Sequence, residues 1–500
     1  MQGHKQYQEK LFVSFQLSDR VPENNFYRML NNCLDLRFLY KATRKYYGLE
    51  GNPGLDPIVF FKLILVGYFE NLQSDRRIIE HSKLRMDVLF FIGYNIDEQL
   101  PWHSTLSRTR QLYGEEVFIA LFNEVLKQCV DKGMVAGRRQ VVDSVLVNAN
   151  ASLDSLVRKQ ILEDGAEYAS NLTEDDEMQS PEKKSSKRSN KDWESPSDKD
   201  ARIARKPGKP TKMNYLGQVS VDSAHHVITN IEAHHADKRD SECFPDVLDH
   251  TIANLSNNNL KVEEVLADTN YSSPEAIKAA QSHNIIAFIP NIGSYKPEKE
   301  GFTYNEMGDY YECNGGAKLH FKGIRVKSEK QEVRDYASTT SDCKECPLKL
   351  NCVGKKGYKR LSHSTNKELY DQMQSRISTN YGRQMKKKRQ STVEPVIGTL
   401  VNFLAMKKVN SRGLAQANKI MIGAAIAYNL KKWMKWETKK SKTIALALPI
   451  PEKKSNAGLL YQHFFNKNRL VNIKSRLKSI FLKVSHRLTQ KNNRYQLAGI

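Results

Sequence analysis

The sequence predicts a mixed α/β fold that follows an all-helical segment. In the first 135 residues apolar side chains recur at helical spacing, as in DPIVFFKLILVGYFENL (residues 56–72). At residue 139 the pattern becomes the alternation of a strand, in RQVVDSVLVNAN (139–150). After residue 213 strands come first and then alternate with helices, which is the order of a mixed sheet flanked by helices.

The composition favours a polyanionic partner. Lys and Arg number 78 against 56 Asp and Glu, which gives a net charge of +22. Such a charge favours nucleic acid, because each contact to a phosphate releases a condensed counterion; the alternative is a solubilising surface. The chain has no apolar run long enough for a signal peptide or a membrane span, and its seven cysteines argue against a disulfide framework. We therefore expect a cytoplasmic protein.

Residues 1–135 are interpreted as a helical DNA-binding domain. A short helix after residue 103 carries Arg108 and Arg110, and arginines on a short helix beside a turn are compatible with a helix-turn-helix-like module. A plain helical bundle explains the same pattern equally well. The two alternatives stay open at this point.

Two later stretches depart from the composition of a packed domain. The segment 171–214 almost lacks aliphatic residues, so it is predicted to be a disordered insertion within a domain that spans 136–435. The segment 436–500 is a basic tail. It contains NRLVNIKSRLKSIFLKVSHRLTQKNNR, which predicts an amphipathic helix that docks on DNA or on the rest of the protein.

Two aspartates stand where an ionised side chain needs a partner. Asp143 interrupts an apolar strand, and Asp268 follows another strand at a polar turn. Each alone is more simply explained as a solvent-facing or turn-capping residue. Glu394 adds a third carboxylate, in a helical pattern beside the basic run KKKR (386–389). Mg²⁺ prefers carboxylate oxygens from separate elements, and a pair of such ions activates both oxygens in phosphoryl transfer.

A series of motifs resembles those of bacterial insertion-sequence transposases of the DDE type. In chain order they are VVDSVLVNANAS (141–152), VLADTNYSSPEA (265–276), YYECNGGAKLHFKGI (310–324), CKECPLKLNC (343–352) and STVEPVIGTL (391–400). The resemblance covers most of residues 50–435 and implies a ribonuclease-H-like catalytic core, with a cysteine-bearing insertion at about 300–380 before the catalytic Glu. In such proteins the first Asp lies on the first strand, the second just after the fourth, and the Glu on a later helix. Those catalytic, metal-binding positions correspond here to Asp143, Asp268 and Glu394.

The basic residues before Glu394 are expected to hold DNA. In the wider group such residues contact the transposon end, and Arg389, five residues before Glu394, is the matching candidate; Lys388 belongs to the same basic run. Pro395 is expected near the start of the helix, where its missing N–H costs little. Rival third carboxylates lie in stretches that favour strand or loop; they are Glu312, Glu332 and Asp335.

The insertion also has the spacing of a metal site. Cys343 and Cys346 form a CxxC pair, and Cys352 supplies a third thiol, a pattern that indicates zinc. Either Cys313 or His363 would complete four ligands. Three unrelated thiols in a loop are the alternative.

These observations together predict a DNA transposase that uses two Mg²⁺ ions, or Mn²⁺. It would cleave at the ends of its insertion sequence and join the freed 3′ hydroxyl to target DNA. The expected partners are double-stranded DNA, as inverted-repeat ends and target, and further copies of the chain in a homodimer or higher oligomer. A catalytically inactive DNA-binding protein derived from a transposase is the main alternative, and a nuclease without strand transfer is another.

Overall fold

The computed structural model describes most of the chain between residues 12 and 447. Outside the description lie residues 160–187 and 448–500, most of the first 13 residues, and 49, 52–53, 207, 209, 294, 329–330 and 354–355. The chain divides into two compact units, Met1–Thr438 and Lys439–Ile500. The amphipathic helix predicted for the tail therefore lies outside the described residues.

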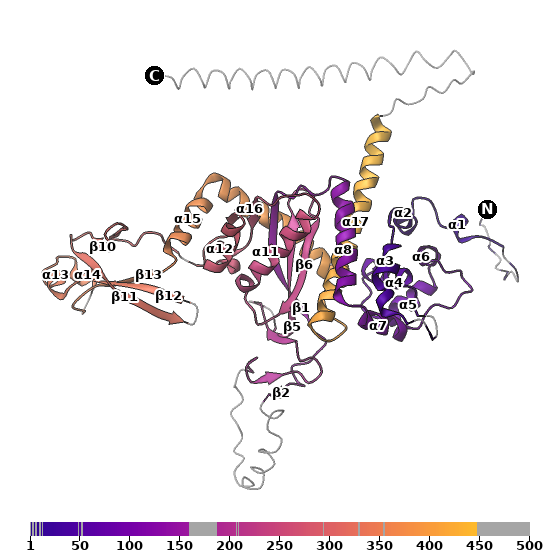
Figure 1. Ribbon diagram of the computed structural model, residues 1–500, viewed down its shortest axis with the longest axis horizontal. Coiled ribbons are helices and arrows are strands. Elements are labelled where there is room, and N and C mark those ends of the chain that lie inside the picture. The colour runs from indigo at the N-terminus through magenta and orange to yellow at the C-terminus, as the bar shows by residue number, and fades with distance from the viewer. Residues whose placement is uncertain are drawn as a thin grey trace, which may run out of the picture. The chain divides into compact units, whose positions relative to one another are not determined.

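Short helices make up the described chain before residue 132 (Figure 1). They are α1 (Leu17–Arg20), α2 (Phe26–Cys33), α3 (Phe38–Thr43), η1 (Arg44–Tyr46), α4 (Pro57–Phe69), α5 (Asp75–Lys83), α6 (Met86–Ile92), α7 (His103–Leu112) and α8 (Glu115–Asp131). The Asp56 carboxylate caps α4 by accepting hydrogen bonds from two N–H groups of its first turn, and Pro57 starts the helix. α4 is buried on nearly every side, which explains why it is apolar all round.

A mixed sheet forms the centre of the following region. In the described chain its strands are β1 (Arg139–Asn148), β4 (Arg202–Ala204), β5 (Lys212–Asp222), β6 (Ile228–His235), β7 (Glu264–Leu266) and β8 (Ile286–Phe288). β1 pairs antiparallel with β5 and parallel with β7. β6 pairs antiparallel with β5, and β8 pairs parallel with β7. An antiparallel β1–β5–β6 meander joined to two parallel strands confirms the predicted ribonuclease-H-like core.

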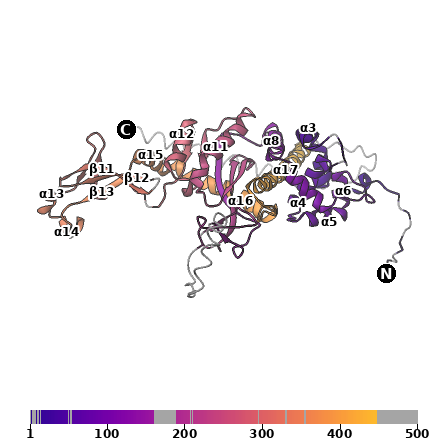
Figure 2. The same ribbon diagram turned by 60° about the horizontal axis from the view of Figure 1, so that its bottom comes forward.

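Helices cover both faces of this sheet (Figures 1 and 2). They are α11 (Asp240–Ser256), α12 (Pro274–Ser282), α15 (Lys367–Ser378), α16 (Asn380–Phe403) and α17 (Leu414–Ala447). On β5, Ser220 accepts a hydrogen bond from Thr251 of α11, whereas Gly217 faces Met421 of α17. Because residues 217 and 220 point to opposite faces of a strand, α11 and α17 lie on opposite sides of the sheet.

A second sheet, entirely antiparallel, is inserted between β8 and α15. Over the described residues its order is β13 (Arg360–Ser364), β12 (Gln331–Ala337), β11 (Lys318–Ser328), β10 (Tyr310–Cys313) and β9 (Phe302–Asn305). Two short helices, α13 (Thr340–Lys344) and α14 (Lys349–Cys352), connect β12 to β13. The cysteines predicted to bind zinc all lie in this insertion, with Cys313 on β10 and the other three on or between α13 and α14.

Part of the segment predicted to be disordered has a defined structure. Of residues 171–214, those up to 187 lie outside the described chain, but β3 (Trp193–Glu194) pairs with β2 (Val157–Arg158), and β4 and the start of β5 follow. The buried Asp198 carboxylate accepts hydrogen bonds from the Tyr215 hydroxyl and the Gly413 N–H. Polar residues are ordered here by hydrogen bonds, which a count of aliphatic residues does not detect.

The position expected for Pro395 was wrong. α16 begins at Asn380, so Pro395 lies in the helix interior and not near its start. Its missing N–H leaves the Ser391 carbonyl without the usual partner four residues on, which is a recognised cause of local helix distortion.

α17 connects the N-terminal helices to the sheet. The Tyr68 hydroxyl of α4 donates a hydrogen bond to the Ile420 carbonyl at 2.9 Å, and Asn429 exchanges two hydrogen bonds with the backbone of Ile228 on β6. Gly423 allows the close approach, since a Cβ there would lie 2.5 Å from the Tyr68 ring. Among the described helices, none is long and apolar enough to cross a bilayer.

Gly423→Ala is expected to destabilise the protein by about 1–3 kcal/mol, because the buried Tyr68 ring is held by its hydrogen bond and cannot move aside. Thermal unfolding measures the change. Gly398→Ala is the control: it is also a helical glycine, nothing lies within 4 Å of its Cβ position, and alanine there should be neutral or stabilising. Equal melting temperatures for the two variants would contradict the close packing of α17 on α4.

Candidate active site

Asp143 lies at the middle of β1 and faces α16. Val145 and Val147 share its face of the strand and are buried, as the alternation predicted. The Asp143 side chain itself is 16% exposed. A partly exposed carboxylate in an otherwise buried strand requires a cation, and the cation present is an arginine of α16.

Asp268 follows β7 and begins the short helix η2 (Thr269–Tyr271). Its carboxylate accepts hydrogen bonds from the Asn270 N–H at 2.9 Å and from the Asn270 side-chain amide at 3.2 Å. Burial, followed by repulsion from the nearby Asp143 carboxylate, raises the pKa of Asp268. The parallel pairing of β7 with β1 therefore brings the two aspartates together, although 125 residues separate them in the chain (268 − 143).

Glu394 joins them from α16 through Arg389. Arg389 Nη1 donates a hydrogen bond to Asp143 Oδ2 at 2.9 Å, and Nη2 donates one to Glu394 Oε1 at 3.4 Å. Arg389 is largely buried, at 16% exposed, whereas Glu394 is 49% exposed. One guanidinium thus spans carboxylates of the strand and the helix, and Glu394 remains accessible to a ligand.

A second polar cluster fixes α16 against the sheet near its first turn. Glu264 of β7 accepts hydrogen bonds from Arg139 of β1 and from the Tyr381 hydroxyl of α16, and Arg139 also donates to Tyr381 at 2.7 Å. The Glu264 side chain is only 6% exposed, so the two bonds that its carboxylate accepts are partly shielded from water. The cluster sets the position from which α16 presents Arg389 and Glu394.

The sequence analysis missed the residues that support the two aspartates from the other face. Gln218 of β5 donates to Asp240 at the start of α11, at 3.1 Å, and accepts from the buried Tyr271 hydroxyl of η2. Burial is the largest cause that raises the pKa of Asp240. Asp240 resembles an ordinary acidic residue of a first helical turn, and nothing in the sequence distinguishes it from one.

The rival third carboxylates all lie on the inserted sheet. Glu312 is exposed on β10, and Glu332 lies on β12. Asp335 is buried and paired with Arg325 and Arg360, whose side chains, with Ser362, hold its pKa well below the ordinary value. None of these side chains is hydrogen-bonded to the Asp143 cluster in the described contacts, which favours Glu394.

The structure separates the residues predicted to bind DNA. Lys388 and Arg389 lie on α16 beside the carboxylates, and Arg108 is exposed on α7. Arg110 needs correction, since its guanidinium donates two hydrogen bonds to Asp75 and its side chain is only 14% exposed. It holds α7 against α5 and is not available to a phosphate.

The three carboxylates suit a divalent ion chemically, because hard ions prefer oxygen ligands from separate elements. Among the residues that the structure describes, however, no three His, Cys, Asp or Glu side chains stand ready to hold a metal ion. At Asp143, Asp268 and Glu394, which we call the carboxylate triad, Arg389 explains why no ready metal site is found. Its guanidinium lies between Asp143 and Glu394, where a cation would have to bind. Its guanidinium must leave Asp143 before both carboxylates can bind one ion.

Two protein-family models match parts of the chain. Residues 15–112 match a transposase domain (DUF772), and residues 312–434 match a transposase DDE domain. The second match includes Arg389 and Glu394, but neither match extends over Asp143 or Asp268. No curated protein matches the chain.

Solved transposase structures are only distantly similar. The chain is 10% identical to the piggyBac transposase in a synaptic complex with hairpin DNA, over 86% of this chain and 84% of that one, with a TM-score of 0.29. It is 12% identical to the Mos1 transposase in a paired-end complex with the left transposon end, over 52% of this chain and 67% of that one, with a TM-score of 0.16. These low scores carry no argument about the site.

The chain is therefore a DNA transposase whose catalytic part is a DDE domain. Membership of this class implies use of a divalent metal ion and of DNA as the substrate.

Replacing Arg389 with alanine should raise the affinity for Mn²⁺ in the absence of DNA by roughly tenfold, because it removes a positive charge from between two carboxylates. Titration calorimetry with Mn²⁺ measures this. Arg383→Ala is the control, since Arg383 lies on the same helix but is bonded to Asn380. Unchanged or weaker Mn²⁺ binding by the Arg389 variant would show that the two carboxylates do not share an ion.

Proposed function

We propose that Asp143, Asp268 and Glu394 are the catalytic carboxylates of this transposase. The observation that carries the proposal is Arg389, which bonds to Asp143 and Glu394 at once, while Asp268 lies close enough to Asp143 to feel its charge. The reaction would be cleavage at the ends of the insertion sequence, followed by joining of the 3′ hydroxyl to target DNA. Water would be the nucleophile in the first step and the 3′ hydroxyl in the second.

The triad residues would hold two Mg²⁺ ions, or Mn²⁺, which would supply Lewis acidity at the attacked phosphate. The chain's own contribution is to position its ligands. β1 and β7 are parallel neighbours and hold the two aspartates rigidly, whereas α16 brings Glu394 on a helix braced by Tyr381. Asn270 orients the Asp268 carboxylate through two hydrogen bonds.

The DNA contacts would begin at the same helix. Lys388 and Arg389 precede Glu394 on α16 and would hold the backbone of the transposon end next to the carboxylates. Arg108, exposed on α7, would contribute from the N-terminal helices, residues 1–135, which we propose form a DNA-binding domain. Binding of inverted-repeat ends and target DNA by a homodimer or higher oligomer is part of the proposal, and a cytoplasmic location stays a prediction of the sequence.

A catalytically inactive DNA-binding protein remains the alternative function. Its defining feature would be a damaged triad, but all three carboxylates are present and two of them share one arginine. The zinc ion predicted for the insertion is a separate proposal, because its cysteine ligands lie on β10, α13, α14 and the turn between the two helices, none of which carries Asp143, Asp268 or Glu394.

Glu394→Gln, like Asp143→Asn and Asp268→Asn, should abolish Mg²⁺-dependent cleavage while leaving binding to the element's ends nearly intact. Loss of a metal ligand should reduce the rate by more than the roughly hundredfold that loss of a supporting residue can cost. Cleavage of a labelled end and a gel-shift assay measure the two properties on the same substrate.

Glu332→Gln is the control for Glu394→Gln, since it removes one carboxylate charge at an exposed residue of β12, away from the contacts of Asp143. It should cleave at nearly the wild-type rate. If the Glu394 variant cleaves normally and the Glu332 variant does not, Glu394 is not the third ligand.

DNA affinity should fall steeply as salt rises, because several phosphates are neutralised at once by a chain of net charge +22. For about six phosphate contacts the loss would be roughly a thousandfold between about 50 and 200 mM salt. Fluorescence anisotropy with an end-containing duplex measures the slope. A flat response would contradict backbone contacts by the basic residues.

A further inference from the structure

The inserted sheet has very little hydrophobic core of its own. In its described residues only Tyr311, Leu319 and Tyr336 form a buried apolar cluster, with a few partly buried neighbours. Several large apolar side chains of β11 face solvent instead, among them Ile324 and Val326. A module of this size with so small a core normally needs a disulfide or a metal ion to hold its shape.

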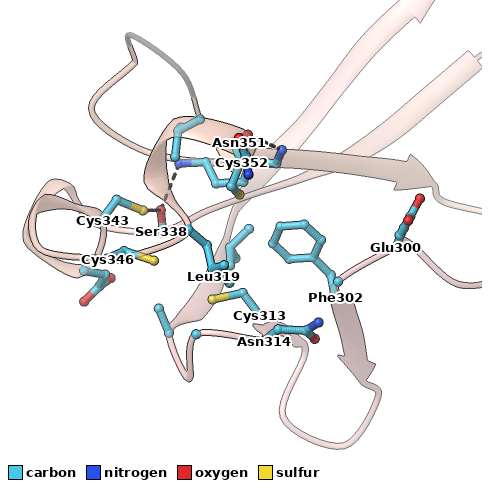
Figure 3. Close-up of a pocket in the computed structure, with 17 residues that line it drawn as sticks. Glu300, Phe302, Cys313, Asn314, Leu319, Ser338, Cys343, Cys346, Asn351 and Cys352 are labelled. Carbon is cyan, nitrogen blue, oxygen red and sulfur yellow. Dashed lines mark hydrogen bonds between the residues drawn. The ribbon is translucent and has the colours of Figure 1, made fainter.

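The end of the sheet next to α13 and α14 gathers four of the chain's seven cysteines around one cavity (Figure 3). Cys313 comes from the end of β10, Cys343 from α13, Cys346 from the turn after it and Cys352 from the end of α14. The cavity has a volume of about 300 Å³, and Figure 3 shows the four cysteines among the residues that line it. The remaining three cysteines, Cys33, Cys129 and Cys243, lie on other helices.

The turn after β10 brings two of these thiols especially close. Gly316 has a φ of +79°, which glycine adopts without strain, and its N–H donates to the Cys313 carbonyl at 2.8 Å. A Cβ on Gly315 would lie 3.6 Å from Cys313 Sγ and 3.4 Å from Cys346 Sγ. Thiols from positions 313 and 346 therefore meet beside the same glycine, although they belong to different parts of the sheet.

The structure also decides between the two candidates for a fourth ligand. His363 lies on β13 within an aromatic cluster, where its Nδ1 is hydrogen-bonded to the Tyr311 hydroxyl at 2.8 Å, and burial lowers its pKa to about 4. It does not line the cysteine cavity, whereas Cys313 does. The complete set is thus four thiols, with no histidine.

We propose that Cys313, Cys343, Cys346 and Cys352 bind one structural zinc ion that joins β10 to the α13–α14 segment. Four thiolates are a complete tetrahedral set for zinc, with Zn–S bonds of about 2.3 Å, and leave no open position for a substrate. The thiols are free and do not yet form a ready-made site in the described chain, so binding requires their side chains to turn inward by rotation about Cα–Cβ. Each thiol loses a proton as its bond to zinc forms.

The surroundings suit the two negative charges of such a complex. Lys359 lines the cavity, lies over the Phe302 ring and donates a hydrogen bond to the Cys352 carbonyl at 2.8 Å. Its ammonium group is therefore fixed beside the thiolates by contacts that do not involve the metal. The position of the cation is independent support for an anionic centre at this end of the sheet.

The first test is metal analysis of protein purified without chelators. The wild type should contain about one zinc per chain. Zinc should be lost from Cys313→Ser and from Cys343→Ser/Cys346→Ser, but retained by His363→Gln and by Cys33→Ser. Asp143→Asn should also retain it, which separates this ion from any metal held by the carboxylate triad.

Spectroscopy of the wild-type protein tests the proposal even if the cysteine variants fail to fold. Replacement of the ion by Co²⁺ should give the visible absorption of a tetrahedral site and the near-ultraviolet charge-transfer bands of four thiolates. Absence of zinc from the wild type, retention of zinc by Cys313→Ser together with its loss from His363→Gln, or a Co²⁺ spectrum of an octahedral oxygen site would each overturn the proposal. So would only three reactive thiols in the denatured, unreduced chain, because that count would mean two disulfides among the four cysteines.

Discussion

The fold depends most on helix α17, which is buried between the N-terminal helices and the central sheet. Its lysines contact the N-terminal helices. Lys419 is 2% exposed and donates hydrogen bonds to the carbonyls of Arg110 and Tyr113 at the C-terminal end of α7. Its side-chain amides contact the sheet, where Asn429 exchanges two hydrogen bonds with the backbone of Ile228. These hydrogen bonds from Lys419 and Asn429 favour one register for the helix, whereas its apolar surface alone would tolerate sliding. The central sheet is consequently held from the face on which Asp143 lies.

A second constraint acts at the active site, where like charges are held together by one arginine. Burial and then repulsion from the Asp143 carboxylate raise the pKa of Asp268, and the positive charge of Arg389 acts in the opposite direction. The Arg389 side chain is long and lies on the same helix as Glu394, so it can leave Asp143 while the helix stays in place. A site of this kind is stable in the absence of metal and DNA. A metal ion can compete with Arg389 for the carboxylates, and DNA can compete with the carboxylates for Arg389.

Much of this arrangement could be predicted from the sequence, for identifiable reasons. Asp143 breaks a clear alternation of valines, and Asp268 ends a strand, so both local patterns survive in the structure. The support from Gln218, Asp240 and Tyr271 could not be predicted, because it depends on pairing between elements far apart in the chain. The prediction that Arg110 binds DNA was wrong for a related reason. Whether an arginine is exposed depends on a distant partner, here Asp75, that no local pattern reveals. The ordered residues around Asp198 escaped prediction because hydrogen bonds, and not apolar burial, hold them.

The inserted sheet separates Asp268 from Glu394 in the chain, yet helix α16, which follows it, still returns to Asp143 on the central sheet. The contacts that allow this lie where the inserted sheet joins the core. The Asn291 amide donates to the Tyr370 carbonyl of α15 at 2.9 Å, and the Arg376 guanidinium donates to the Ala287 carbonyl of β8 at 2.8 Å. These bonds close the insertion at its base and place α15 on the sheet before α16 begins. The position of Glu394 is therefore determined by α15 and by the brace at Tyr381, while the thiols act at the other end of the insertion. Loss of a zinc ion there would loosen β10 against α13 and α14, and the carboxylates would keep their geometry.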